Sequence, residues 1–264
     1  MAVTDILLYL LTGAVAGVSA GLLGIGGGLI IVPILFFIFS SQSVPAAHVM
    51  HIALATSLAT IIITSLSSAY AHHKRGAVLW PLVFSLSPGI VVGAWLGAML
   101  ASSLASDILK PVFGLFELLV AIHLLINYRP DTHSSSISTA TSTIGGVVIG
   151  GISSIVGIGG GTLTVPFLLW HNISIRNAVA SSAACGFPIA VAGTAAYVVS
   201  GWSVEGLPAY TLGYVNLSAF AIIIMTSMIA APAGAALAHK LPEKTLRLLF
   251  ALFLLALATR MLLF

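Results

Sequence analysis

The sequence has 264 residues, of which 59% are hydrophobic and 6% are charged, and its formal net charge is +3. An ordinary soluble domain carries about 25% charged residues, so nine Lys/Arg and six Asp/Glu are too few to cover a water-facing surface of this size. This composition argues against a soluble globular protein, a disordered chain and a nucleic-acid binder, and it predicts an all-α polytopic membrane protein in a lipid bilayer.

The first half of the chain, residues 1–127, is expected to be one membrane repeat. Its first apolar segment, Asp5–Phe39, is too long for one span of roughly 20 residues, and the stretch GLLGIGGG interrupts it. Three spans follow at Pro45–Ala71, Val78–Ala101 and Ile108–Asn127. Residues 128–143 are polar and rich in Ser and Thr, so we expect a linker there.

The second half, residues 144–264, is expected to be a second membrane repeat with the same order of elements. Ile144–Trp170 is again a long apolar segment, and GIGGG interrupts it. Three spans follow at Arg176–Ser200, Leu212–His239 and Thr245–Phe264. With the short pieces of the two broken segments counted, we expect about 8–10 membrane helices.

The two halves can be matched block by block. Gly24–Gly28 and Gly157–Gly161 have the same sequence and lie 133 residues apart. Ala55-Thr56-Ser57 matches Ala180-Ser181-Ser182 at a separation of 125 residues, and Gly97-Ala98 matches Gly234-Ala235 at 137. The separation changes only where loops differ in length, so the matches predict an internal duplication.

Basic residues predict the orientation of the two repeats. The loop His72–Arg75 is strongly basic, which places it in the cytoplasm. The equivalent loop of the second half, Gly201–Thr211, contains no Lys or Arg, whereas Lys240 and Lys244 occur one loop later. Because the bias changes sides between the halves, we expect two inverted-topology repeats, a cytoplasmic linker and both termini outside.

The broken segments predict the class of protein. Inverted repeats that each carry a Gly/Pro-interrupted segment are typical of secondary transporters, whose substrate site lies near the membrane midplane where the broken helices meet. A half-helix that starts after such a break points free N–H groups and the positive end of its dipole at the cavity, which suits an anion. The expected substrate-binding glycines are Gly24, Gly26, Gly27, Gly28, Gly157, Gly159, Gly160 and Gly161.

Small residues have a second role in membranes, because they allow helices to pack closely. We favour that role for the glycines at four-residue spacing: Gly13, Gly17, Gly21, Gly93 and Gly97.

Two matched pairs of hydroxyl residues are further candidates for the substrate site. Thr56 and Ser57 in the first half correspond to Ser181 and Ser182 in the second. Hydroxyl groups can donate several hydrogen bonds to an oxyanion and still release it. The alternative is that they bond back to carbonyl groups of their own helix, and the sequence leaves the two roles equally open.

Four ionisable residues are candidates for attracting the anion or for coupling transport to another ion. His48 and His51 lie near the start of a span, where an interfacial position is the alternative. Arg176 matches His51 in the repeat and would attract an anion to one mouth. Glu117 lies in mid-span with Leu254 at the equivalent position, and it either carries a proton or bonds a neighbouring helix.

No pattern of residues indicates an enzyme, a metal site or a cofactor. The acidic residues are scattered, whereas a metal site needs clustered ligands. The GIGGG runs lack the GK[ST] ending of a nucleotide-binding loop, so ATP-driven transport by this chain alone is not expected. Cys185 is the sole cysteine, and an intrachain disulfide is therefore excluded.

The residues of the two breaks carry a family resemblance that covers nearly the whole chain. GLLGIGGGLIIVP and IVGIGGGTLTVP, each followed by a Thr/Ser-Ser step, resemble the sulfite exporter TauE/SafE family of membrane permeases. The resemblance implies export, and sometimes uptake, of sulfite, sulfonates and related sulfur-containing anions. Carried over by position, it implies a substrate site at both glycine runs, at Thr56 and Ser57, and at Ser181 and Ser182. Ser181 stands where the first half has Thr56, which is a small departure between the repeats.

The expected function is therefore secondary transport, by alternating access, of sulfite or a small organosulfonate across the cell membrane. An anion channel for the same substrates and a non-transporting scaffold or sensor subunit are the open alternatives. The expected partners are the small anion and the bilayer, with a homodimer left open and nucleic acid excluded.

Overall fold

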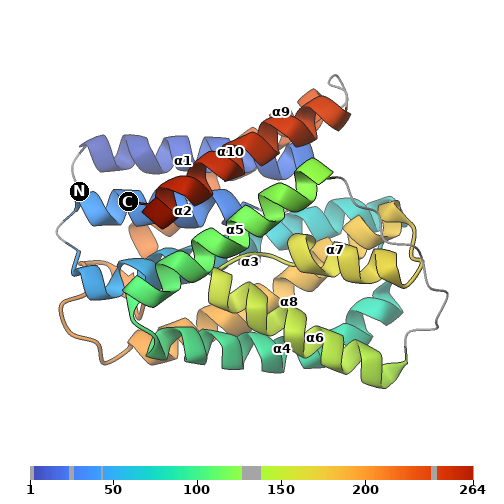
Figure 1. Ribbon diagram of the computed structural model, residues 1–264, viewed down its shortest axis with the longest axis horizontal. Coiled ribbons are helices and arrows are strands. Elements are labelled where there is room, and N and C mark those ends of the chain that lie inside the picture. Colours follow the sequence, from blue (N-terminus) through green and yellow to red (C-terminus); the bar gives the residue numbers. More distant parts are fainter. Residues whose placement is uncertain (1–2, 24–26, 43, 127–137, 239–242, 264) are drawn as a thin grey trace.

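The computed structural model describes residues 3–23, 27–42, 44–126, 138–238 and 243–263. Its first half consists of α1 (Val3–Leu23), α2 (Gly28–Ser41), the short 3-10 helix η1 (Ala46–His48), α3 (Val49–Lys74), α4 (Trp80–Ser103) and α5 (Ser106–Ile126) (Figure 1). The second half consists of α6 (Thr139–Val156), α7 (Gly161–Trp170), α8 (Ile175–Gly201), β1 (Thr211–Leu212), β2 (Val215–Asn216), α9 (Leu217–Ala238) and α10 (Glu243–Leu263).

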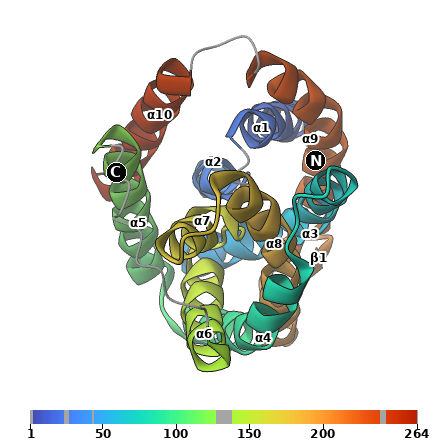
Figure 2. The same ribbon diagram turned by 90° about the vertical axis from the view of Figure 1, so that its right-hand side faces the viewer.

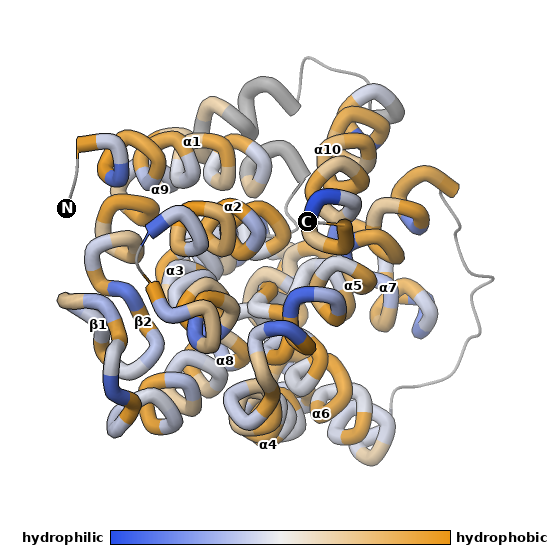
Figure 3. The backbone as a smooth tube through the Cα atoms, turned by 60° about the vertical axis from the view of Figure 1, so that its left-hand side comes forward, coloured by the Kyte–Doolittle hydropathy of each residue, from blue (hydrophilic) through white to orange (hydrophobic). Residues whose placement is uncertain are grey.

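The expected all-α polytopic membrane fold is confirmed. Within the described ranges, seven helices are long and apolar enough to cross a membrane, and α2, α7 and the apolar part of α9 are shorter. Large apolar side chains such as Leu115, Leu119 and Leu249 point outward from the bundle. Figure 3 shows that hydrophobic residues dominate along the helices, including those on the outside. An apolar exterior of this kind is suited to lipid.

Both long apolar segments are broken where glycines interrupt them. α6 ends at Gly157, whose φ of +69° is left-handed and therefore favours glycine. The N–H groups of Gly157 and Ile158 both donate to the carbonyl of Ser153, which closes the end of the helix. α7 then begins at Gly161, and the Thr164 N–H donates to the Gly160 carbonyl at 2.8 Å. In the first half α2 begins at Gly28, while the candidates Gly24 and Gly26 lie outside the described residues.

Two expected boundaries were wrong. α6 starts at Thr139, so Thr139–Thr143 are helical and not linker, because the Ser138 side chain caps the helix by accepting from the Thr141 N–H at 3.1 Å. The span expected from Leu212 starts at Leu217, because residues 211–216 form a two-stranded hairpin. Asn216 ends this hairpin and caps α9, since its side-chain oxygen accepts from the Ala219 N–H at 2.9 Å.

The largest helix contacts run between the two halves of the chain. α1 packs along α9, α4 packs along α6, α3 packs along α8 and α5 packs along α10 (Figure 2). In the order of elements, α1 corresponds to α6, α3 to α8, α4 to α9 and α5 to α10. Exchanging each helix for its counterpart turns the α1–α9 pair into the α4–α6 pair and leaves the α3–α8 and α5–α10 pairs unchanged. The two halves are therefore interleaved in one packed body.

Glycines allow two of these helix pairs to approach closely. A Cβ atom on Gly17 of α1 would lie 2.5 Å from the backbone oxygen of Ser227 in α9. Gly93 and Gly97 of α4 face the α6 backbone at Val147 and Gly151 in the same way. The packing role predicted for Gly13, Gly17, Gly93 and Gly97 is confirmed, whereas no side-chain environment is described for Gly21.

α3 is the most enclosed of the candidate spans. In the most apolar 18-residue window of each span, 78% of the residues are buried for Ala46–Lys74, against 28% for Ser106–Ile126 of α5. α3 and α8 lie together inside the bundle with α2 and α7, and the other helices surround them (Figure 2). The two helices that begin at the glycine breaks are therefore held in the interior.

Candidate functional site

The two glycine breaks, which are far apart in the sequence, meet inside the protein. A Cβ atom on Gly28, the first residue of α2, would lie 2.7 Å from the carbonyl oxygen of Gly157 and 2.9 Å from the Cα of Ile158. α3 adds a polar contact here, because the Ser57 hydroxyl donates to the Gly157 carbonyl at 2.7 Å. The start of α2, the end of α6 and the middle of α3 thus form one junction.

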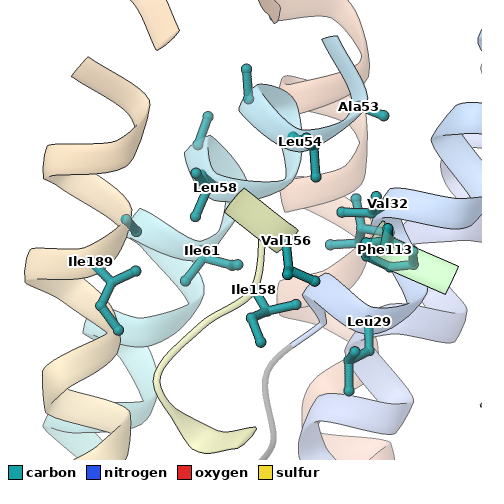
Figure 4. Close-up of a cluster of buried hydrophobic side chains, with 14 of the residues drawn as sticks. Leu29, Val32, Ala53, Leu54, Leu58, Ile61, Phe113, Val156, Ile158 and Ile189 are labelled. Carbon is teal, nitrogen blue, oxygen red and sulfur yellow. The ribbon is translucent and has the colours of Figure 1, made fainter. Parts of the chain in front are cut away.

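The junction is surrounded by apolar side chains. Figure 4 shows Leu29 and Val32 from α2, Leu54, Leu58 and Ile61 from α3, and Val156, Ile158 and Ile189 from the second half. Its polarity therefore comes mainly from the backbone groups of the two breaks. Hydrogen bonds are electrostatically stronger in such a low-dielectric surrounding than in water, so a few N–H groups can hold an anion there.

The second break is pressed against α8 by Gly160. A Cβ atom at this position would lie 2.6 Å from the Ser182 carbonyl oxygen and 3.0 Å from the Gly186 nitrogen. Gly159 has more room, because its Cβ would lie 3.4 Å from the Ile61 side chain. Gly160 is therefore needed for packing, whereas Gly159 has no such steric requirement.

Thr56 and Ser181 make equivalent contacts in the two halves. The Thr56 hydroxyl accepts from the N–H of Asn216, the residue just before α9, at 3.0 Å. The Ser181 hydroxyl accepts from the N–H of Leu79, the residue just before α4, also at 3.0 Å. Leu79 and Asn216 are 137 residues apart, the separation that relates α4 to α9. We call these two contacts the paired helix-start hydrogen bonds.

Ser57 and Ser182 differ from each other. The Ser57 hydroxyl reaches across to the second break, as described above. The Ser182 hydroxyl donates to the Val179 carbonyl of its own helix at 2.8 Å, which is the local back-bonding considered as the alternative. All four predicted hydroxyl residues are fully buried, but Ser57 alone among them contacts a described residue of the glycine breaks through its hydroxyl.

Several buried hydroxyl groups near the second break were missed by sequence reasoning. Ser153, Ser154 and Thr164 are fully buried, and their hydroxyl oxygens have no hydrogen-bond partner among the described residues. Thr164 lies in the first turns of α7, and Ser153 is the residue whose carbonyl closes α6. Unpartnered polar groups are costly in an apolar interior, so they are candidates for binding a polar ligand. Their only signal in the sequence was proximity to the glycine run.

His48 and His51 lie away from the breaks, beneath the β1–β2 hairpin. The His51 ring stacks on Tyr214 of the hairpin, with 5.0 Å between centroids and 23° between planes. Its Nε2 lies 3.0 Å from the Leu104 carbonyl, and its Nδ1 lies 3.3 Å from the Ser106 hydroxyl. Burial raises the pKa of the Tyr214 phenol. Tyr214 was not predicted as a site residue, because the hairpin itself was not predicted.

Arg176 and Glu117 are placed in opposite environments. Arg176 is exposed, and its guanidinium donates to the Arg75 carbonyl at 3.1 Å, so it lies beside the basic loop after α3. Glu117 is fully buried in α5, and neither carboxylate oxygen has a hydrogen-bond partner among the described residues. These contacts do not place Arg176 or Glu117 at the junction.

Comparisons with known proteins agree with this architecture. The profile of the family described as "Sulfite exporter TauE/SafE" matches residues 9–261. A "Probable membrane transporter protein" of Haemophilus influenzae is 41% identical over 259 residues, which cover 98% of each chain. A probable membrane transporter protein of Methanocaldococcus jannaschii is 28% identical, with 92% of this chain and 90% of the relative covered. One of Bacillus subtilis is 29% identical, with 91% and 94% covered.

No solved structure matches the chain. The family profile nevertheless spans nearly all of the sequence, both glycine breaks included, and the described helices have the lengths and apolar surfaces of a multi-pass membrane protein. This chain is a membrane protein that belongs to the sulfite exporter TauE/SafE family.

Proposed function

We propose that the protein is a secondary transporter that exports sulfite or a small organosulfonate from the cell by alternating access. The observation that carries the proposal is the junction of the two glycine breaks, where Gly28 contacts Gly157 and Ile158 inside an apolar core. Backbone N–H groups at the start of α7, together with buried hydroxyls such as Thr164, would bind the anion without a formal positive charge.

The paired helix-start hydrogen bonds support a mechanism with two gates. Thr56 is in the second turn of α3, and Asn216 belongs to the hairpin at that end of the helix. Leu79 follows the opposite end of α3, which finishes at Lys74. In the orientation predicted from the basic residues, the Thr56 contact faces outward and the Ser181 contact faces the cytoplasm. Breaking one contact while the other holds would open the junction to one side only.

Export is consistent with the electrical force on an anion. A negative cell interior favours outward movement of negative charge by about 2.3 kcal/mol per charge per 100 mV. We place the protein in the plasma membrane with both termini outside. In this proposal the chain performs no catalysis and needs no cofactor, and a homodimer is left open.

Ligand binding to the purified protein tests the substrate class. Thermal shift would be measured with sulfite, sulfate, thiosulfate, taurine, sulfoacetate and acetate, and with proline as a control. We expect saturable stabilisation by sulfite or a sulfonate. The matched variant is Gly159→Ala, which has room for its methyl group, so a folded variant with weakened binding would support backbone contact with the anion. No shift with any sulfur anion would remove the substrate class.

Flux in proteoliposomes separates the alternatives. A transporter predicts saturable uptake that is stimulated by the same anion on the opposite side. Flux that neither saturates nor shows this stimulation would indicate an anion channel, and no flux would indicate a scaffold or sensor subunit.

A further inference from the structure

Glu117 is a buried acid whose environment is explained neither by packing nor by the binding of an anion. Its side chain is 0% exposed, and both carboxylate oxygens are without a partner in the described part of the chain. A carboxylate that lacks water, a donor and a counter-ion is strongly destabilised. Intramembrane acids of this kind are expensive and usually mark the path of an ion or a proton.

Helix geometry places Glu117 at about the depth of the first turn of α2. The Lys110 amine lies 5.5 Å from the centre of the Phe36 ring, so the start of α5 approaches the later turns of α2. The two helices run in opposite directions, because Ser106 at the start of α5 bonds the Ala47 carbonyl just beyond the end of α2 (Figure 1). Glu117 is two turns beyond Lys110 on nearly the same face, or about 10 Å further along the axis.

On α2, moving about 10 Å from Phe36 toward the start of the helix reaches Leu29, in the first turn. Phe113, which lies between Lys110 and Glu117 on α5, is in the same buried cluster as Val32 and Leu29 (Figure 4). Glu117 is therefore level with the start of α2, which contacts Gly157 of the second break.

Two ionisable groups on elements near Glu117 make contacts with other residues. The Arg260 guanidinium of α10 lies 4.3 Å from the centre of the Phe37 ring, and His51 of α3 contacts Leu104 and Tyr214. α2, α4, α6, α7 and α9 contain no titratable residue. The remaining groups on α3, α5, α10 and η1 with described side chains are His48, Tyr70, His72, His73, Lys74, Asp107, Lys110, His123 and Arg247.

We propose that the Glu117 carboxyl is the proton-binding site that couples anion transport to the movement of H⁺. In the closed protein the carboxyl holds a proton. When a gate opens to one side of the membrane, the carboxyl of Glu117 exchanges its proton with water on that side. The anion is bound and released without forming or breaking a covalent bond. An ionised Glu117 at the depth of the first turn of α2 would repel the bound anion, so proton and anion occupy the protein together and cross together. The electrical force that favours export then acts only on the anion charge that the proton leaves uncompensated, and for a monovalent sulfonate the concentration and pH gradients set the direction. The inference rests on the proposed function, because it assigns the coupling ion of that transporter.

The test uses full-length protein in vesicles that contain a trapped pH-sensitive dye. The probes are isethionate and thiosulfate, because neither anion titrates near neutral pH. Two quantities are measured: exchange of radiolabelled probe between the two sides, and net probe movement together with the change in internal pH. The variant is Glu117→Gln, and the matched control is Glu205→Gln, which removes an exposed carboxyl from a loop.

For the wild-type protein and for Glu205→Gln we expect exchange, proton movement with the anion, and accumulation driven by a pH gradient. Glu117→Gln should retain exchange but lose proton movement and gradient-driven accumulation. Glu117→Leu, which introduces the residue found at the equivalent position Leu254, provides a second variant if the amide does not fold.

The proposal could be overturned in two ways. Net probe movement by the wild-type protein without a change in internal pH, or proton movement that persists in a folded Glu117 variant, would exclude Glu117 as the proton site and leave the transporter intact. Absence of exchange of either probe by wild-type protein would contradict transport of these anions, and the coupling inference would fall with it.

Discussion

The two glycine breaks have the same sequence, GIGGG, but they are packed differently. In the second break Gly160 is pressed against the α8 backbone, whereas the nearest described atoms to a Cβ on the equivalent Gly27 belong to the Ile31 and Ala16 side chains. Ser57 donates to the second break across the halves, while its counterpart Ser182 bonds within its own helix. Among the described residues, these backbone and hydroxyl contacts lie at the second break. We infer that the second break is the rigid partner of the junction.

The largest effect should come from placing a methyl group on the equivalent glycines. Gly160→Ala forces a Cβ to within 2.6 Å of the Ser182 carbonyl oxygen, and overpacking of this kind typically costs about 1–3 kcal/mol. Gly27→Ala meets the Ile31 and Ala16 side chains at 3.1 and 3.2 Å, which requires a smaller shift than the 2.6 Å backbone contact at Gly160. Thermal unfolding of both variants in detergent checks the prediction. Equal loss of stability would show that the breaks are packed alike.

The second comparison removes the equivalent hydroxyls. Ser57→Ala leaves the buried Gly157 carbonyl without this donor, and an unsatisfied group of that kind costs about 1–3 kcal/mol. Ser182→Ala loses only a bond to its own helix, and we expect a change of less than about 0.5 kcal/mol. Chemical unfolding and anion exchange of the two variants would be measured together. A larger effect at Ser182 would contradict the assignment of the second break as the rigid partner.

Removing either of the paired helix-start hydrogen bonds should lower the stability of the protein by a similar amount. The two removals should, however, open the junction to opposite sides of the membrane. Thr56→Val and Ser181→Ala each remove one acceptor of a backbone N–H, and each should cost about 1 kcal/mol. Thr56→Val should favour opening to the outside and Ser181→Ala opening to the cytoplasm. The buried Cys185 would be replaced by Ala, and a reporter cysteine at Gly159 would be labelled from each side. Labelling from the same side in both variants would contradict two opposed gates.

The smallest effect is expected at Arg176, which is equivalent to His51 in the repeat. Arg176 is exposed, whereas His51 is buried against Tyr214. Arg176→Gln should therefore change stability by less than about 0.5 kcal/mol and weaken anion entry only at low salt, where surface charges are least screened. The apparent affinity for the anion would be measured at two ionic strengths. A large effect that does not depend on salt would instead place Arg176 in the binding site.

The sequence predicted the all-α membrane fold and the two breaks, because these follow from apolar length and from consecutive glycines. It did not predict the β1–β2 hairpin, since residues 211–216 continue directly into an apolar helix. The contacts of the hydroxyls were also beyond prediction. Thr56 and its donor Asn216 are 160 residues apart, and a repeat shows which positions correspond but not which atoms they touch. For the same reason, equal residues at Gly27 and Gly160 did not reveal unequal packing.

Exchange of a radiolabelled sulfur anion across proteoliposomes tests the central claim most directly. We predict that sulfite or an organosulfonate enters saturably and that the same anion trapped inside accelerates its entry. We also predict that Gly27→Leu and Gly160→Leu, combined in one chain, abolish this exchange. Unchanged exchange in that folded double variant, or flux without acceleration from the opposite side, would contradict an alternating-access site at the glycine breaks.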